Sequence, residues 1–321
     1  MSLCGISRRR LIAGTAAAAA LSQVSAESLS IASAGREAVV YQTTSLTAEG
    51  LVAALRSVQS TFKGRIAVKL HTGEPHGPNI LPREWVKALI NELPDAVIVE
   101  TNTLYGGPRA AASRHRETLV TNGWTFAPVD ILDEDGGTPW PIAGGSRLKS
   151  VTVGSHLDRY DSMLVLTHFK GHGMAGFGGS LKNISIGCAS GKLGKQQIHQ
   201  LPGDGSWPGG PLFMERMVEG GKAITNHFGQ HITYINVLRN LSVDCDCAGL
   251  GAAAPTTPDL GIIASTDILA VDQASVDMVY ALPEAQRRDL VERIESRSGL
   301  RQLEYMKLQG MGNNQYDLIT V

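Results

Sequence analysis

Short apolar runs alternate along the chain with longer stretches in which apolar residues recur every three or four positions. The short runs predict strands at Ala38–Gln42, Arg65–Leu70, Ala96–Glu100, Trp124–Pro128, Ser150–Val153, Met163–Thr167, Ile232–Val237, Leu260–Ala264 and Tyr316–Val321. The longer stretches predict helices at Leu46–Phe62, Arg83–Leu93, Arg109–Asn122, Asp267–Leu282, Glu284–Ser296 and Leu300–Gln309. Because strands alternate with helices, we predict an α/β fold with a largely parallel or mixed sheet flanked by helices.

Polar clusters follow four of the predicted strands. They begin at His71, Thr101, His168 and Ser265. In open parallel sheets, ligands bind at the carboxyl ends of the strands. We therefore expect these clusters to meet at one edge of the sheet, although loops are polar in any case.

The segment from Ser162 to Gly203 contains no Asp or Glu, and it is rich in glycine, lysine and histidine. Glycines allow a backbone to approach a ligand closely and expose N–H donors, so the segment is typical of an anion cradle. The alternative is a surface loop whose lysines are solvated. We assign substrate contacts or catalysis to Lys170, Lys182 and Asp272, the last from the helix that Asp267 caps. We assign ligand or cofactor contacts to Gly171, Gly173, Gly176, Gly178, Asn183 and Asn102.

Two nucleotide-binding motifs fail within this segment. Gly171 to Gly176 matches G-x-G-x-x-G, but no carboxylate follows at the distance at which a dinucleotide fold binds the ribose. Gly187 to Leu193 resembles a phosphate-binding loop that is one residue short and has leucine in place of the magnesium-binding hydroxyl. We therefore expect neither a nicotinamide cofactor nor ATPase activity.

Metal-binding side chains occur in two groups. His168 and His172 are four residues apart, with His199, His71 or His76 available to complete a site. The run from Asp244 to Cys247 places two thiols and two carboxylates together. The predicted ligands are His168, His172, Asp244, Cys245 and Cys247. The alternatives are hydrogen-bonded histidines, a polar loop with buried thiols, or a strained Cys-x-Cys disulfide.

The N-terminus predicts export. Arg8, Arg9 and Arg10 precede an Ala-rich apolar run, and Val24-Ser25-Ala26 has the small residues of a cleavage site. We predict a twin-arginine signal over 1–26, a tether over 27–36, a single α/β domain over 37–321, and a periplasmic protein. The alternatives are an ordinary secretory signal and a membrane anchor, but the apolar run is shorter than the roughly 20 residues needed to span a bilayer. We expect no membrane span after cleavage and export by the twin-arginine machinery, which often carries proteins already loaded with a cofactor.

The net charge and the cysteine count limit the kinds of partner and cofactor that we expect. The net charge is −1, and loss of 1–26 takes Lys+Arg from 29 to 26 against 30 acidic residues, which gives −4. The chain has no excess of positive charge, so we expect no nucleic-acid partner. Three cysteines remain without Cys4, and without a CxxC motif they cannot ligate an iron–sulfur cluster alone.

Several motifs together resemble the domain-of-unknown-function 362 family, whose members are often labelled iron–sulfur centre proteins. The resemblance is carried by His168-Phe-Lys-Gly-His172, by Gly-Phe-Gly-Gly-Ser-Leu-Lys-Asn183, by Glu100 to Tyr105, by Asp244 to Cys247, and by Ser265-Thr-Asp267 with Asp272-Gln-Ala274. It implies an α/β domain suspected of metal or redox chemistry. Longer members carry a four-cysteine, ferredoxin-like insert after the position of His199, whereas Leu201–Leu212 here has no cysteine. We therefore identify a short form and expect no iron–sulfur cluster.

These observations favour an exported, metal-dependent enzyme, with an oxidoreductase among the candidates, that acts on a small anionic substrate. The alternative is a non-catalytic periplasmic protein that binds or carries a metal or a small anion. A third hypothesis, a partner of a membrane redox complex, requires an exposed apolar patch beside the site.

Overall fold

The computed structural model describes residues 37–203 and 205–321, so the predicted signal peptide and tether lie outside the described residues. The strands are β1 (Ala38–Thr43), β2 (Ile66–Lys69), β3 (Ala96–Glu100), β4 (Val129–Ile131), β5 (Gly137–Pro141), β6 (Ser150–Gly154), β7 (Ser162–His168), β8 (Lys170–His172), β9 (Gly176–Gly178), β10 (Ile232–Leu238), β11 (Gly261–Ser265) and β12 (Tyr316–Thr320). The α-helices are α1 (Ala48–Arg56), α2 (Arg83–Asn91), α3 (Ala112–Thr121), α4 (Ser180–Cys188), α5 (Leu193–His199), α6 (Gly210–Phe228), α7 (Ile268–Tyr280), α8 (Glu284–Ser296) and α9 (Arg301–Leu308).

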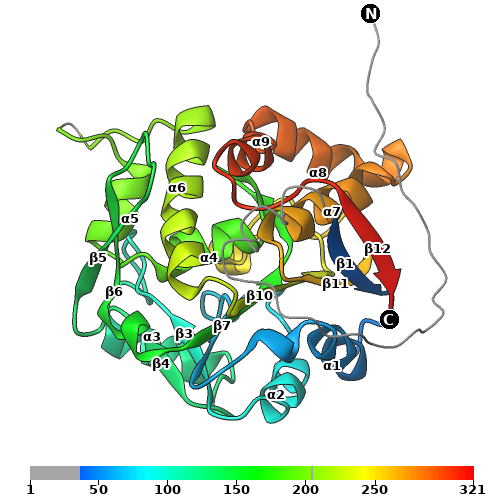
Figure 1. The fold of residues 1–321 in the computed structure, drawn as a ribbon, viewed down its shortest axis with the longest axis horizontal. Helices are drawn as coiled ribbons and strands as arrows, with labels where there is room; N and C mark the ends of the chain where they lie inside the picture. Colours follow the sequence, from blue (N-terminus) through cyan, green and yellow to red (C-terminus); the bar gives the residue numbers. More distant parts are fainter. Residues whose placement is uncertain (1–36, 204) are drawn as a thin grey trace, which may run out of the picture.

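Eight strands form one sheet in the order β12-β1-β11-β10-β7-β2-β3-β4, which runs from right to left in Figure 1. β11 pairs antiparallel with both β1 and β10, and the other pairings in this sheet are parallel. The predicted α/β class, with a largely parallel or mixed sheet flanked by helices, is confirmed.

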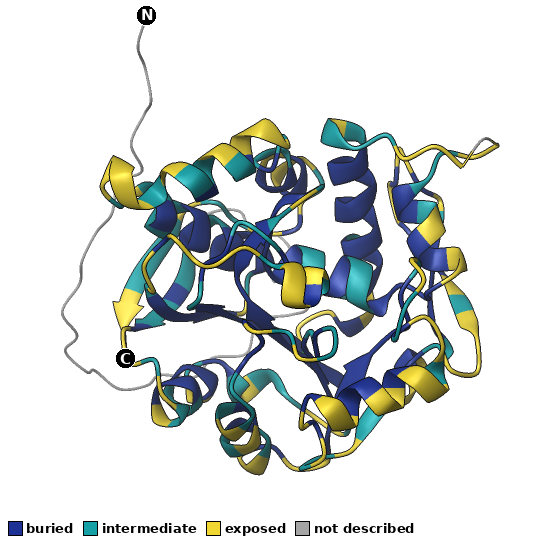
Figure 2. Cartoon of the chain, turned by 180° about the vertical axis from the view of Figure 1, so that it is seen from behind, coloured by how far each residue is buried: buried dark blue, intermediate teal, exposed yellow. Residues whose placement is uncertain are grey.

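Helices cover both faces of the sheet (Figure 1). One face packs against α1, α2 and α3 through a cluster that includes Leu51, Val86 and Leu119. The other face packs against α4, α6, α7, α8 and α9 through a second cluster that includes Leu181 and Met217. The strands between them are buried along most of their length, whereas the helices show exposed residues on their outer sides (Figure 2). Burial on both faces explains why these strands are continuous apolar runs.

Most predicted elements form within a few residues of their expected bounds, but some differ. Trp124–Pro128 is not a strand: Pro128 has no N–H to donate, Nε1 of Trp124 bonds the carbonyl of Thr72, and pairing begins at Val129. The run at Ser150 pairs in a separate hairpin with β5 rather than in the main sheet. The glycine-rich segment after β7 forms the short hairpin β8–β9 and then the buried helix α4.

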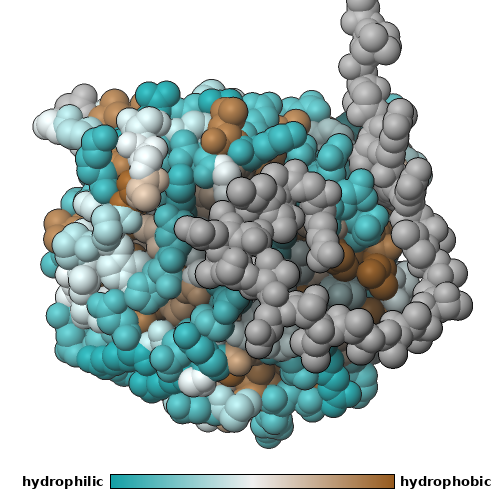
Figure 3. Space-filling model, viewed as in Figure 1, coloured by the Kyte–Doolittle hydropathy of each residue, from teal (hydrophilic) through white to brown (hydrophobic). Residues whose placement is uncertain are grey.

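The face of the molecule shown in Figure 3 is mainly hydrophilic over the described residues, with separate apolar patches. Within the described ranges, no helix combines the length and hydropathy needed to cross a membrane.

Candidate functional site

A cavity of about 380 Å³ lies where the carboxyl ends of β2, β3 and β7 meet the β8–β9 hairpin, the first turns of α4, and the loop after β10. This is the edge at which ligands bind in open parallel sheets. Its wall is formed by Lys69, His71, Glu100, Thr101, Thr103, Leu104, Tyr105, Arg109, Thr167, Lys170, His172, Gly173, Met174, Gly178, Gly179, Lys182, Asn183, Ile186, Gly187, Lys195, His199, Trp207, Asp244, Cys245, Cys247 and Ala248.

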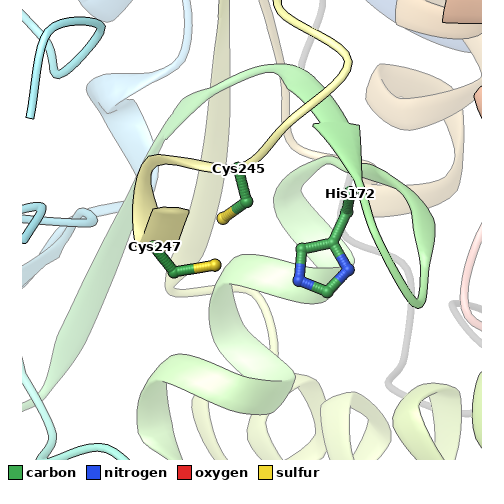
Figure 4. Close-up of side chains that lie close together, drawn as sticks. All are labelled: His172, Cys245 and Cys247. Atoms are coloured by element: carbon green, nitrogen blue, oxygen red, sulfur yellow. The ribbon is translucent and has the colours of Figure 1, made fainter. Parts of the chain in front are cut away.

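Two thiols and one imidazole meet in this wall. The ligand atoms of His172, Cys245 and Cys247 all lie within 4.8 Å of one another. The cysteines come from the loop after β10, and His172 ends β8; one edge of its ring faces the two sulfur atoms (Figure 4). All three cysteines in the described part of the chain are unpaired, so the Cys-x-Cys disulfide does not form here.

The two thiols of this cluster share one proton. The pKa of Cys245 is held well below its usual value, chiefly because the Cys247 thiol donates to it and because the ammonium group of Lys182 lies nearby, despite burial. Nζ of Lys182 is 3.4 Å from Sγ of Cys245. The same hydrogen bond raises the pKa of Cys247. These contacts favour the thiolate form of Cys245, which is the form that binds metals and attacks electrophiles.

His172 is neutral and its tautomer is fixed. Burial and the charge of Lys182 lower the pKa of His172 to about 3. The backbone N–H groups of Ala175 and Met174 donate to its Nδ1, at 2.9 and 3.2 Å. Because Nδ1 accepts, the ring hydrogen lies on Nε2.

Nδ1 of His71 has an acceptor as its partner, whereas Nδ1 of His172 has donors. It follows β2 directly, and its Nδ1 lies 3.1 Å from a carboxylate oxygen of Glu100 at the end of β3. Burial opposes ionisation of Glu100, but Lys69, His71 and Arg109 hold its pKa well below the usual value. An ionised carboxylate only accepts hydrogen bonds, so Nδ1 of His71 donates to Glu100.

Cations outnumber carboxylates in the cavity wall. Five cationic side chains line it, against the carboxylates of Glu100 and Asp244: Lys69, Arg109, Lys170, Lys182 and Lys195. Nζ of Lys195 donates to the carbonyls of Asn102 and Ala189 and to the hydroxyl of Thr101, none of which is charged. Burial lowers the pKa of Lys195 to about 8. The cavity is therefore electrostatically suited to an anion.

Of the site residues predicted from the sequence, nine line this cavity: Lys170, Lys182, Gly173, Gly178, Asn183, His172, Asp244, Cys245 and Cys247. Two of them form salt bridges with residues outside the cavity wall. Nζ of Lys170 lies 3.1 Å from the buried carboxylate of Asp246, and a carboxylate oxygen of Asp244 lies 3.0 Å from Nη1 of Arg293. The charge of Lys170 is therefore balanced by Asp246, and the Asp244 carboxylate is bound by Arg293 of α8 and not by the thiols.

His168 does not join the thiols. Its Nδ1 lies 3.0 Å from both oxygens of Asp246, and its Nε2 donates to the carbonyl of Arg239 at 2.7 Å. No ring nitrogen is left for an ion, so we leave His168 out of the proposed ligand set. The four-residue spacing to His172 does not bring the rings together because His168 ends β7, whereas His172 belongs to the β8–β9 hairpin.

Asp272, Asn102, Gly171 and Gly176 also lie outside the cavity wall. Asp272 is buried and accepts from the backbone N–H groups of Ser180 and Leu181, so it caps α4. The backbone and side-chain nitrogens of Asn102 bond Asp133. Gly171 lies against the backbone of Val243, and Gly176 takes a left-handed φ of 75° at the start of β9. In this structure these four residues hold the loops and the helix start around the cavity.

The sequence predicted that the polar clusters after four strands would lie at one edge of the sheet, and three of the four do. β2, β3 and β7 run in the same direction, but β11 is antiparallel, so Ser265 and Asp267 lie at the opposite edge. There Asp267 lines a second cavity.

Sequence reasoning did not assign a role to Lys69, Glu100 or Arg109. A signal was present: Lys69 and Glu100 stand in strands that are otherwise apolar, and a charge buried in such a strand requires a partner. Nζ of Lys69 lies 3.6 Å from the Glu100 carboxylate. Arg109 bonds Glu74 and the hydroxyl of Tyr105, which no local pattern predicts.

Comparisons with known proteins place the chain in a family without naming an activity. No curated protein matches it. Among solved structures, the lactate racemase apoprotein from Thermoanaerobacterium thermosaccharolyticum is 12% identical, with a TM-score of 0.45, over 75% of this chain and 57% of that one. A Thermotoga maritima protein solved in a structural genomics programme is also 12% identical, with a TM-score of 0.41, over 80% and 60%. The chain thus spans less than two thirds of the length of either structure.

The family model described as "domain of unknown function (DUF362)" matches residues 66–277, well over half of the 321 residues. The matched region contains β2, β3, β7, the β8–β9 hairpin and the cysteine loop, and therefore the whole set of cavity elements described above. The chain belongs to the DUF362 family.

Proposed function

We propose that the cavity is the active site of a metal-dependent enzyme that acts on a small anionic substrate. The observation that carries the proposal is the thiol pair of Cys245 and Cys247 with imidazole nitrogen in reach, set in the wall of a cationic cavity. A site with two cysteines and one histidine leaves a fourth position for water or substrate, as catalytic zinc sites do.

The donor set fits a soft or borderline divalent ion such as zinc. Thiolates and neutral imidazoles are its preferred ligands, and the cavity wall offers thiols whose thiolate form is favoured at Cys245 together with the neutral imidazole of His172. The second thiolate, at Cys247, forms when the shared proton leaves, and the charge of Lys182 offsets it. A bound ion of this kind supplies Lewis-acid polarisation of a substrate oxygen.

The cations of the wall hold the substrate. Two thiolates neutralise a divalent ion, so the charge of Lys182 is then no longer balanced by the sulfur alone. Lys195 has uncharged partners, Lys69 lies beside the Glu100 carboxylate, and Arg109 is paired with Glu74 and lies 3.9 Å from Glu100. An anionic group of a few atoms restores the balance inside a volume of about 380 Å³. We expect a carboxylate or a phosphate next to the metal site.

Export completes the proposal. The arginine pair and the apolar run at the N-terminus support transport by the twin-arginine machinery and action in the periplasm. A fusion of residues 1–36 to a reporter tests it: export must depend on Arg8 and Arg9 and persist for a reporter that folds in the cytoplasm.

Metal analysis of the chain purified from its export host tests the enzyme proposal. We expect about one equivalent of metal per chain, lost in the Cys245→Ser/Cys247→Ser variant. Cys188→Ala is the matched control, because Cys188 is a buried thiol that does not line the cavity. Metal-free protein that nevertheless binds inorganic phosphate or a small carboxylate would replace the enzyme with an anion carrier.

A further inference from the structure

The cavity wall contains a histidine that lies outside the group of two thiols and one imidazole. His199 ends α5, is buried, and lines the cavity. The rings of Phe213 and Trp207 pack against its ring, each with its centroid 5.0 Å from that of the imidazole. The proposed metal site therefore leaves this side chain without a role.

One ring nitrogen of His199 is fixed by its own helix. Nδ1 lies 2.8 Å from the carbonyl oxygen of Lys195, one turn earlier in α5. A carbonyl oxygen only accepts hydrogen bonds, so Nδ1 carries a hydrogen. Burial and the charges of Lys195 and Lys182 lower the pKa of His199 to about 4, so the ring is neutral at pH 7. A neutral ring with its hydrogen on Nδ1 keeps a lone pair on Nε2.

That lone pair has no partner in the described part of the chain, where the Lys195 carbonyl is the only group hydrogen-bonded to the ring. The Nδ1 edge faces the helix and two aromatic rings pack around the imidazole, which leaves the Nε2 edge for the cavity. Buried acceptors in native proteins are nearly always satisfied. A ligand that donates a hydrogen bond at this point is therefore favoured over one that does not.

The charges of the cavity wall decide which kind of donor fits. Five cationic side chains line the cavity, against two carboxylates. Nζ of Lys195, in the same helix as His199, bonds only uncharged oxygens. These cations would repel an ammonium group on the ligand, whereas a hydroxyl group donates a hydrogen bond without adding charge. The wall therefore favours an anion whose donor is a hydroxyl.

We propose, resting on the function proposed above, that His199 accepts a hydrogen bond from a hydroxyl group of the substrate, which is then a small hydroxylated carboxylate or phosphate. The cations of the wall hold the anionic group, and Nε2 of His199 orients the hydroxyl. A site built to bond a hydroxyl rejects the analogue that lacks it, because the buried acceptor is then left unpaired. His199 is therefore the residue that sets this preference.

The probes are anions that differ in one group, and isothermal titration calorimetry of the chain purified from its export host measures their affinities. One pair is 3-hydroxypropionate and propionate, and the other is 3-hydroxypropyl phosphate and propyl phosphate. We expect the hydroxylated member to bind about tenfold more tightly in at least one pair. β-Alanine, which has an ammonium group in place of the hydroxyl, should bind more weakly than 3-hydroxypropionate.

Two substitutions at His199 test the assignment. His199→Phe removes the acceptor and keeps an aromatic ring beside Phe213 and Trp207, so the two members of the preferred pair should bind within about twofold of each other. His199→Gln places an amide oxygen near the position of Nε2 and should restore part of the preference. Nitrogen NMR of the unsubstituted chain tests the same contact without a substitution, because the Nε2 resonance should move upfield only with the hydroxylated anion.

Two further variants serve as controls. His227→Phe makes the same change at an exposed histidine that stacks on Trp140 and does not line the cavity, so it should leave the preference unchanged. Cys245→Ser/Cys247→Ser should also keep it, because the imidazole and not the metal binds the hydroxyl.

The outcomes distinguish this inference from the function on which it rests. Equal affinities within both pairs would overturn the inference and leave an anion site. A preference that persists in His199→Phe, or that disappears in His227→Phe or in the cysteine variant, would assign the hydroxyl to another group and overturn it as well. Failure of all five anions to bind the unsubstituted chain would overturn the anionic substrate itself, and with it the proposed function.

Discussion

The ammonium nitrogen of Lys182, on the first turn of α4, lies 3.4 Å from the sulfur of Cys245, in the loop that follows β10. The contact joins the two segments that the sequence singles out, the carboxylate-free stretch and the cysteine run. It places a positive charge beside a thiol that already accepts a hydrogen bond from Cys247. The lysine therefore stabilises the thiolate rather than contacting solvent.

We expect Lys182→Met to raise the pKa of Cys245 toward that of an ordinary thiol. In the metal-free chain, alkylation of Cys245 by iodoacetamide should be nearly independent of pH between 6 and 8. In the variant the rate should rise by up to about tenfold per pH unit, because only the thiolate reacts. Mass spectrometry identifies the alkylated residue, and Lys192→Met, at an exposed lysine of the same segment, is the control. A steep pH dependence in the unsubstituted chain would contradict the assignment.

The buried carboxylate of Asp246 pairs with His168 and with Lys170, which lines the cavity. Burial opposes its ionisation, but the charges of His168 and Lys170 outweigh it and lower the pKa of the carboxyl group. We expect Asp246→Asn to reduce the free energy of unfolding by about 3–5 kcal/mol at pH 7, because it leaves buried cations unpaired. Asp244→Asn, at a partly exposed carboxylate, should cost less than about 1 kcal/mol.

The effect of Asp246 should depend on pH in one direction. A carboxyl group whose pKa is lower in the folded chain contributes stability that is complete above the unfolded value of 3.8 and is lost as the pH falls through the folded value. The difference between the unsubstituted chain and Asp246→Asn, measured by urea unfolding, should therefore be constant from pH 7 to about 5 and shrink below about 4. A difference that grows on acidification would show that Asp246 is not stabilised as an anion.

Two glycines of the β8 region make a matched pair. A Cβ atom at Gly171 would lie 2.3 Å from the carbonyl oxygen of Val243, whereas one at Gly173 would meet no atom within 4 Å. We expect Gly171→Ala to destabilise the fold by about 1–3 kcal/mol through forced movement of the cysteine loop. Gly173→Ala should be close to neutral in thermal unfolding. Equal effects would mean that the hairpin does not pack against that loop.

Asp272 was expected from the sequence to take part in chemistry, but it caps a buried helix. Asp272→Asn removes one acceptor from the N-terminus of α4 and should lower the free energy of unfolding by about 1–3 kcal/mol. Zinc affinity, measured where the variant is folded, should remain within about threefold of the unsubstituted value. A selective loss of metal binding with unchanged stability would return Asp272 to the site.

Local signals predicted much of the fold. Asp267 was expected to cap a helix, and its carboxylate accepts from the backbone N–H of Ala270. The apolar runs around Val68 and Ile98 predicted strands because both faces of the sheet are covered. The direction of β11 was not predictable, because antiparallel pairing depends on where the chain re-enters the sheet, which no short pattern records.

The site was predicted only in part for the same reason. Cys245 and Cys247 are neighbours in sequence, and the residues around His172 stood out by composition. The partnership of His71 with Glu100 joins two strands through parallel pairing, so it becomes visible only when β2 and β3 lie side by side. His168 stood out equally well, and its bond to Asp246 shows that composition does not distinguish a ligand from a residue that holds a loop.

X-ray absorption spectroscopy of the zinc-loaded chain tests the central claim most directly, because it reports the atoms bound to the ion. The account predicts about two sulfur neighbours at roughly 2.3 Å and nitrogen or oxygen neighbours at roughly 2.0–2.1 Å. The sulfur shell should disappear in Cys245→Ser/Cys247→Ser and persist in Cys188→Ala. A shell of nitrogen and oxygen alone, in a chain whose thiols are shown to be reduced, would contradict it.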